Sequence, residues 1–235
     1  MSKLKITSSI LFLLLLMSNI FAQKTSLDQY RGEIGILGGT SFYIGEANPN
    51  TLFKNPGMAL GALARYNFSP RYALKFSLKR GTVAGDTRDF KNMFPLDREA
   101  SFERKLWDMG LHIEFNFSDY GLPDYHNHNK WFSPYIFTGL GLTSSRDELN
   151  DMSQIDFNFP LGLGIKIKIN NFINLGCEWS WHLMYIDDLD VIDQDTNFLN
   201  NPYGFKETKG FKNKDAYSFA TVFMSIDLFK RKYCK

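Results

Sequence analysis

Net charge is almost absent from this sequence, which has 27 lysines and arginines against 25 aspartates and glutamates. Lys3 and Lys5 lie in an N-terminal segment that we expect to be removed, and that segment contains no acid. The two signs are then equal in number in the mature chain. A chain without an excess of positive charge offers no basis for binding nucleic acid or an anionic membrane surface.

A hydrophobic run long enough for a membrane-spanning helix is also missing. The longest apolar stretch, Ile10 to Met17, is much shorter than the roughly 20 residues that such a helix needs. It follows a basic start and precedes Ala22, a small residue suited to cleavage. We therefore predict a secretory signal peptide at residues 1–22 and one mature domain at residues 23–235. No cysteine follows the run directly, which argues against a lipoprotein.

Cysteine is scarce, and its two positions do not suggest a pair. Two cysteines in an exported chain raise the question of a disulfide. Cys177 falls on the apolar face of a predicted strand, whereas Cys234 lies in the terminal tail. In the barrel predicted below these positions are far apart, so we expect no bridge between them.

What the sequence does contain is a pair of unusually long alternating segments, residues 157–169 and 172–185. In each of them every second residue is apolar, and the residues between are polar or small. A period of two predicts a strand with one apolar face. Asn170 and Asn171 between the segments predict a tight turn.

The length of these segments indicates the class of protein. Strands in soluble proteins usually have about 5–6 residues, whereas strands that cross a bilayer at a tilt need about 9–11. Both segments exceed that length. A membrane barrel turns the apolar face toward lipid and fills its lumen with polar and small residues.

The same pattern recurs along the chain and predicts eight strands. Long and short connections alternate along most of the chain, with short turns at Ser69–Arg71 and Asn170–Asn171. The connection at residues 118–130 is the exception, because it is long for a turn. Long loops are expected at residues 46–56, 81–100, 143–155 and 186–214. We predict an all-β fold: an eight-stranded antiparallel transmembrane β-barrel with long outer loops, located in the outer membrane. Eight strands leave an interior filled by side chains, so we expect no general pore. The strands are predicted at residues 33–45, 58–68, 107–117, 131–142, 157–169, 172–185 and 216–229, with another that carries Leu74 to Lys79.

Charged and histidine side chains on the predicted inner face are the first candidate site. They could form an acid–base site, as in an outer-membrane enzyme. Their matched signs favour a network of paired charges that fills a narrow lumen, because buried charges must be paired. The set is Arg65, Lys75, Lys79, Asp108, His112, Glu114, Lys166, Lys168, Glu178 and His182.

Other candidates are weaker. Serine, histidine and acid are present, but no G-x-S-x-G motif surrounds a nucleophile. His126 and His128 provide two ligands on a loop, too few to define a metal site. The aspartates between Asp187 and Asp195 lack the glycine and the closing glutamate of an EF-hand. We therefore predict no catalytic residue, no metal and no cofactor.

Six segments follow one another along nearly the whole mature chain: Glu33–Pro49, Gly61–Phe68, Ser133–Gly141, Pro160–Lys166, Leu175–Trp179 and Tyr185–Asp190. Each segment is a common Gly-aromatic strand pattern, and the ordered set carries the specificity. In this order they resemble the PorG-type outer-membrane β-barrels of the type IX secretion system, a DUF6089-like family.

The resemblance implies a non-enzymatic component that anchors or assembles the periplasmic ring of the secretion system. The implied partners are outer-membrane lipid and a periplasmic ring lipoprotein with its partner, similar to PorK and PorN. From the sequence, contact is expected through periplasmic turns and the basic tail, at Lys230, Arg231 and Lys232. The alternatives are a lipid-modifying enzyme that uses His112 or His182, a small barrel without a secretion role, and a soluble lipocalin-like barrel.

Overall fold

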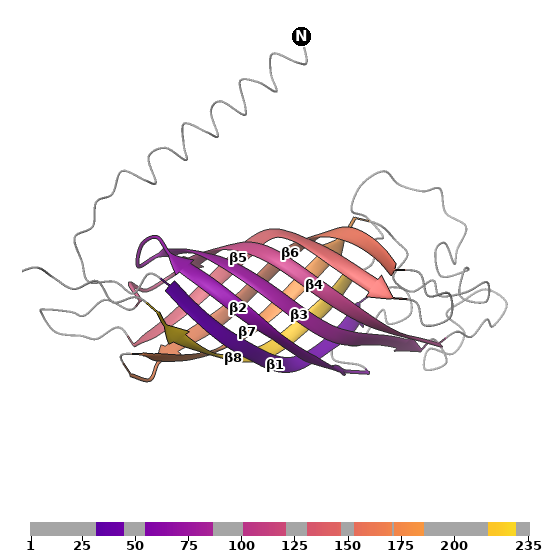
Figure 1. The fold of residues 1–235 in the computed structure, drawn as a ribbon, viewed down its shortest axis with the longest axis horizontal. Helices are drawn as coiled ribbons and strands as arrows, with labels where there is room; N and C mark the ends of the chain where they lie inside the picture. Colours follow the sequence, from indigo (N-terminus) through magenta and orange to yellow (C-terminus); the bar gives the residue numbers. More distant parts are fainter. Residues whose placement is uncertain are drawn as a thin grey trace, which may run out of the picture.

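The computed structural model describes residues 32–44, 55–86, 101–120, 131–146, 153–170, 172–185 and 216–228. These residues form a closed barrel in which each strand is antiparallel to the next and β8 pairs with β1 (Figure 1). The predicted all-β, eight-stranded fold is confirmed. No helix in this part of the chain has the length and hydropathy to cross a membrane. The strands are β1 (Gly32–Ile44), β2 (Gly57–Asn67), β3 (Tyr72–Asp86), β4 (Ser101–Asn116), β5 (Phe132–Arg146), β6 (Ser153–Lys168), β7 (Ile173–Met184) and β8 (Ala216–Asp227).

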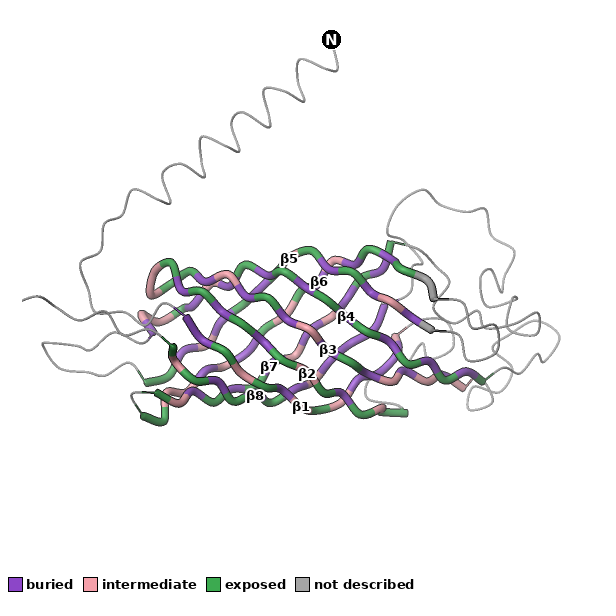
Figure 2. Tube along the Cα trace, viewed as in Figure 1, coloured by how far each residue is buried: buried purple, intermediate pink, exposed green. Residues whose placement is uncertain are grey.

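The outside of the barrel is an apolar band. Buried and exposed residues alternate along the strands (Figure 2), and along β4 the alternation is almost unbroken. Exposed apolar side chains such as Ile36, Leu111 and Leu140 cover the exterior. Trp107 on β4 and Phe117, the residue directly after β4, lie at the two ends of this band. Their ten-residue separation spans about 25 Å at ~3.3 Å per residue and ~40° tilt, the height of a lipid-facing band.

Two short turns close one end of the barrel, as predicted. Ser69 Oγ accepts hydrogen bonds from the backbone N–H groups of Arg71 and Tyr72. Asn170 Oδ1 accepts hydrogen bonds from the N–H groups of Phe172 and Ile173. Side-chain acceptors of this kind hold the backbone of a tight turn. We call this the short-turn end, and the opposite end the long-loop end.

Two loop predictions began too early. Residues 81–86 continue β3 and residues 101–106 belong to β4, so the predicted loop at 81–100 was partly wrong. Likewise β5 continues to Arg146 and β6 begins at Ser153, inside the predicted loop at 143–155. The alternation of apolar and polar residues did not reveal these strand ends, because it inverts between Trp107 and the long-loop end. Beyond that level Thr82, Glu103 and Lys105 face outward, while Val83, Phe102 and Leu106 are buried. As a result, β3 and β4 extend beyond β1 and β2 at the long-loop end (Figure 1).

Large aromatic side chains fill the lumen because glycines face them. A Cβ atom on Gly81 would lie 2.8 Å from Cε1 of Phe219, and one on Gly164 would lie 2.6 Å from the Tyr135 ring. Such distances leave no room for a side chain on the opposite strand. Two buried apolar clusters result. One contains Leu37, Leu63, Tyr135, Phe137 and Phe223, and the other contains Tyr43, Ala59, Val83, Phe102, Leu106, Met184, Tyr217 and Phe219.

The hydrogen-bond ladder between β5 and β6 lacks one backbone donor. Register pairs run from Phe132↔Ile167 to Thr138↔Leu161 and resume at Gly141↔Asn158 without a shift. Lys168 donates its N–H to Trp131 O, so even-numbered residues of β6 direct their backbone polar groups toward β5. Position 160 shares that direction, and proline has no N–H to donate to the Gly139 carbonyl.

The lumen as candidate functional site

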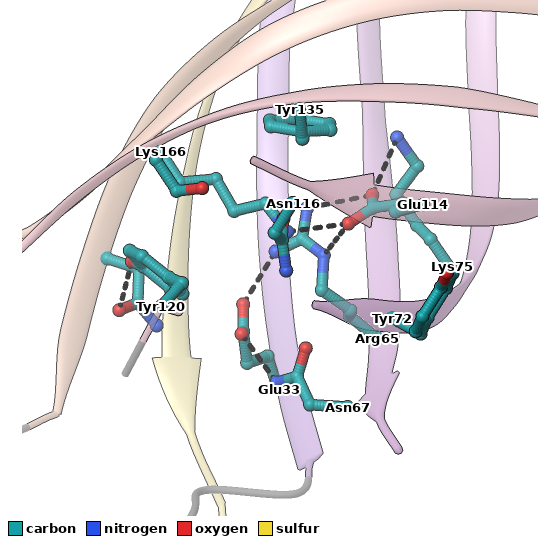
Figure 3. Close-up of polar contacts among 12 residues, drawn as sticks. Glu33, Arg65, Asn67, Tyr72, Lys75, Glu114, Asn116, Tyr120, Tyr135 and Lys166 are labelled. Atoms are coloured by element: carbon teal, nitrogen blue, oxygen red, sulfur yellow. Dashed lines mark hydrogen bonds and ion pairs between the residues drawn. The ribbon is translucent and has the colours of Figure 1, made fainter. Parts of the chain in front are cut away.

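Arg65 is the centre of a charge network near the short-turn end. Its Nη1 lies 2.6 Å from Glu33 Oε2, and its Nε lies 2.9 Å from Glu114 Oε2. Figure 3 shows the guanidinium between these two carboxylates, which come from β1 and β4. All three side chains are buried. A guanidinium with several carboxylates around it is the arrangement that makes a buried cation tolerable.

Two lysines complete this network. Lys75 Nζ donates a hydrogen bond of 2.7 Å to Glu178 Oε1, and Lys166 Nζ donates one of 2.6 Å to Glu114 Oε2. Tyr135 donates its O–H to the same Glu178 oxygen at 2.6 Å. Side chains from β3, β5, β6 and β7 therefore meet in one cross-section of the barrel, which closes the lumen at this level.

Tyr120 closes the lumen mouth at the short-turn end. It follows β4, is 4% exposed, and donates its O–H to Asn174 Oδ1 at 2.8 Å. Burial raises the pKa of the Tyr120 phenol well above its ordinary value, so the phenol stays protonated as a donor. The ammonium groups of Lys166 and Lys168 lie 5.7 and 6.0 Å from its ring centroid. The start of the long 118–130 connection thus serves as a plug.

Charges inside the described part of the barrel are balanced. Lys168, half-buried near the mouth, pairs with Asp227. With this pair included, six cations face six anions in the lumen. The cations are Arg65, Lys75, Lys79, Arg104, Lys166 and Lys168, and the anions are Glu33, Asp108, Glu114, Asp156, Glu178 and Asp227.

A second polar cluster surrounds Asp108 nearer the long-loop end. Tyr217 donates its O–H to Asp108 Oδ2 at 2.7 Å, and Asn158 Nδ2 donates to the same oxygen at 3.0 Å. His182 Nδ1 lies 3.2 Å from Asp108 Oδ2. On the other side of the ring, His182 Nε2 lies 3.1 Å from Ser180 Oγ.

Ser180, His182 and Asp108 thus have the hydrogen-bond order of a serine–histidine–acid relay. Ser180 is 1% exposed, and His182 and Asp108 are fully buried. The backbone N–H groups beside them belong to the strand ladders, which leaves no free pair of donors for an oxyanion. The arrangement lies wholly inside the barrel and surrounds Asp108 with hydrogen-bond partners.

His112 forms a separate contact. Its Nε2 lies 2.9 Å from Ser77 Oγ, and its ring stands edge-on to Phe137 at 5.3 Å between centroids. Both histidines of the proposed lipid enzyme therefore lie inside the barrel. A lipid on the outer surface contacts neither of them.

All ten members of the predicted inner set lie on the inner face. Sequence reasoning omitted four charged partners from that set. Glu33 has the parity of the buried Leu37, and Asp227 has that of the buried Ser225, so alternation along β1 and β8 places both residues on the inner face. Arg104 and Asp156 lay just before the predicted strands at residues 107–117 and 157–169, in residues assigned to neither a strand nor a loop. At Arg104 the inverted pattern of β4 concealed the signal, whereas Asp156 lies between the outward apolar residues Ile155 and Phe157 and was excluded only because the predicted strand began one residue too late.

Several other predicted features lie outside the described residues: Lys230, Arg231 and Lys232, His126 and His128, the aspartates from Asp187 to Asp195, and Cys234. Cys177 is exposed on the outer face of β7, and the expected absence of a disulfide stays a prediction. Within the described ranges, no three histidine, cysteine or acidic residues form a group that could hold a metal ion.

Comparisons with solved structures return other small barrels. The N-terminal β-barrel domain of Pseudomonas aeruginosa OprF is 12% identical, with a TM-score of 0.46 over 85% of this chain and 98% of that one. Neisserial surface protein A is 11% identical, with a TM-score of 0.49 over 84% and 97%. The outer membrane enzyme PagL is 12% identical, with a TM-score of 0.36 over 84% and 99%.

Sequence comparison gives a more specific result. No curated protein is significantly similar to the chain in sequence. Residues 6–234, nearly the whole chain, match a family described as "Domain of unknown function (DUF6089)". The chain is therefore a member of the DUF6089 family.

Proposed function

We propose that this protein is a non-enzymatic outer-membrane β-barrel of the PorG type, which anchors or assembles the periplasmic ring of the type IX protein secretion system. The observation that carries the proposal is the filled lumen. Arg65 and its carboxylates occupy one cross-section, and Tyr120 occupies the mouth. A barrel that holds neither a channel nor an accessible reacting group acts through its rims.

The PorG resemblance supports this proposal at the level of particular residues. Five of the resembling segments each contribute a side chain to the lumen network: Glu33, Arg65, Tyr135, Lys166 and Glu178. The resemblance therefore includes the groups that fill the barrel as well as the lipid-facing pattern. A shared structural scaffold explains why the resembling residues are spread over the lumen. In a family of enzymes, the shared residues would instead cluster around an exposed reacting group.

The short-turn end is the rim that we assign to the periplasm. A chain that follows a signal peptide begins on that side, and β1 begins at the short-turn end. β8 ends at the same rim, where Leu228 donates its N–H to Gly32 O. The basic tail with Lys230, Arg231 and Lys232 follows directly. A periplasmic ring lipoprotein and its partner, similar to PorK and PorN, can reach this rim and no other part of the barrel.

The test is a pull-down of the tagged protein from detergent-solubilised outer membrane, with the co-purifying proteins identified. We expect a periplasmic ring lipoprotein and its partner, and we expect cargo proteins to stay in the periplasm of a deletion strain. Recovery of the barrel alone, together with normal export in the deletion strain, would remove the secretion role.

The tail has a separate test. Charge reversal at Lys230, Arg231 and Lys232 should reduce ring association. Glu103→Lys, which reverses an exposed charge on β4 at the opposite end, is the matched control and should leave association unchanged. Equal recovery of the ring by the tail variant and the control would show that the tail takes no part.

A lipid-modifying enzyme is the second candidate, because Ser180, His182 and Asp108 have relay-like spacings of 3.1 and 3.2 Å. Such an enzyme needs an opening through the wall that brings lipid to a buried histidine. An unchanged lipid composition in a strain that carries His112→Ala and His182→Ala would exclude it, provided that the variant barrel is folded.

A further inference from the structure

The outer surface of β3 and β4 changes character at one level. Below that level the outward side chains are apolar, including Phe76, Leu111 and Met109. Arg80 and Trp107, which are register partners, mark the change. Above them the outward residues of both strands are polar, small or charged. This level is the border between hydrocarbon and headgroups at the long-loop end.

Basic residues from adjacent strands gather at this border. The Arg80 guanidinium lies 5.5 Å from the centroid of the exposed Trp107 ring. Lys105 is exposed on β4, two residues beyond Trp107. Neighbouring strands are about 4.8 Å apart, so Arg80 and Lys105 are within reach of one group.

The order of charged residues along β4 indicates which kind of ligand fits this border. Moving outward, Trp107 comes first, then Lys105, and Glu103 comes two residues later. The cations therefore lie directly above the apolar band, and the acid lies farther from it. The phosphates of a lipid headgroup occupy the same place relative to the acyl chains.

The short-turn end has a different arrangement. There Arg71 is half-exposed, and its Nε lies 2.8 Å from Asp119 Oδ1. Lys166 and Lys168 belong to the lumen network rather than to the outer face. Among the described residues, basic side chains from adjacent strands gather at an apolar border at the long-loop end alone.

We infer that Arg80 and Lys105 form a binding site for the phosphate of a lipid headgroup in the outer leaflet, with the acyl chains on the apolar residues below. A guanidinium presents paired N–H donors that match phosphate oxygens, and an ammonium adds a point charge. Free phosphate has no apolar part that could contact the apolar surface beneath the cations, whereas a lipid has acyl chains. This site is independent of the proposed secretion role.

The experiment measures lipid binding by native mass spectrometry of the full barrel in a non-ionic detergent. The probes are diphosphorylated lipid A, the same lipid after removal of both phosphates, and inorganic phosphate. The variant is Arg80→Gln with Lys105→Gln, and the control is Arg71→Gln at the other end. A shift between heated and unheated samples on a gel establishes that each variant is folded.

The wild type and Arg71→Gln should bind diphosphorylated lipid A with equal affinity, and the double variant should bind it roughly thirtyfold more weakly. Equal affinity of the folded double variant and the wild type would overturn the site. Equal binding of the dephosphorylated lipid would also overturn it, because acyl contacts alone would then account for affinity. Equal competition by inorganic phosphate and by lipid A would overturn the assignment to a lipid.

Discussion

Glu33 on β1 and Arg65 on β2 are register partners, and their side chains form an ion pair of 2.6 Å inside the barrel. Arg65 also contacts Glu114 and Glu178. One cation therefore compensates carboxylates that come from β1, β4 and β7. Removing it leaves several buried charges with fewer partners, which costs more than any one of these contacts contributes.

Replacing Arg65 with methionine should therefore destabilise the barrel strongly. We expect a loss of about 3–5 kcal/mol in the free energy of unfolding, the range for breaking a buried ion pair. Urea titration in lipid vesicles, followed by the gel shift of the folded form, measures it.

Arg71→Gln is the matched control for this prediction. The Arg71 side chain is 50% exposed beside Asp119, and an exposed ion pair is worth at most about 1 kcal/mol. Equal losses in the two variants would contradict the central place of Arg65.

The contact between Gly81 and Phe219 predicts a coupled pair. A methyl group on Gly81 would lie 2.7 Å from Ser41 Oγ and 2.8 Å from Phe219 Cε1, with no backbone atom among its nearest neighbours. Gly81→Ala should therefore destabilise the barrel, and Phe219→Leu should relieve part of that strain. We expect a coupling of about 1 kcal/mol in a double-mutant cycle measured by urea titration. Strictly additive losses would show that the ring is not what limits the residue at position 81.

The filled lumen predicts that the protein carries no ionic current. In planar bilayers the wild type should give no current steps. Tyr120→Ala should stay closed too, because the Arg65 cross-section and the cluster around Phe137 and Phe223 remain. Regular single-channel openings in either protein would mean that the lumen rearranges in the membrane.

Variants of Ser180 and His182 should distinguish a structural role of this cluster from a catalytic one. Ser180→Ala removes one hydrogen bond to His182 and should cost about 1 kcal/mol. His182→Ala also removes one of the partners of buried Asp108 and creates a cavity, so it should cost about 2–5 kcal/mol. A hydrolase would instead lose activity to a similar extent with either change, as shown by lipid analysis of strains that carry each folded variant.

The alternation of apolar and polar residues was sufficient to predict the strands and their inner faces. Ile34 and Leu111 face outward and Lys75 and Glu178 inward, because a period of two leaves no freedom once one face meets lipid. The turns at Ser69 and Asn170 were also predictable, since their side chains hold the backbone locally.

The pairings inside the lumen could not be predicted in the same way. Lys75 binds Glu178, which is 103 positions away along the chain, and that pairing depends on barrel closure. The ends of β3 and β4 were missed for a different reason. Above the apolar border the outward residues are polar, small or charged and Phe102 and Leu106 lie inside, so the rule that applies within the apolar band reverses.

Pro160 gives the wall an uneven mechanical strength. At Gly139 one donor is missing in the middle of the β5–β6 ladder. The proline that faces β4, Pro134, lies at the short-turn end of the β4–β5 junction, where its carbonyl accepts the N–H of Phe117. If the closed sheet is pulled apart, we expect the β5–β6 seam to open first, which leaves β6–β8 attached to β1–β5 through the pairing of β8 with β1.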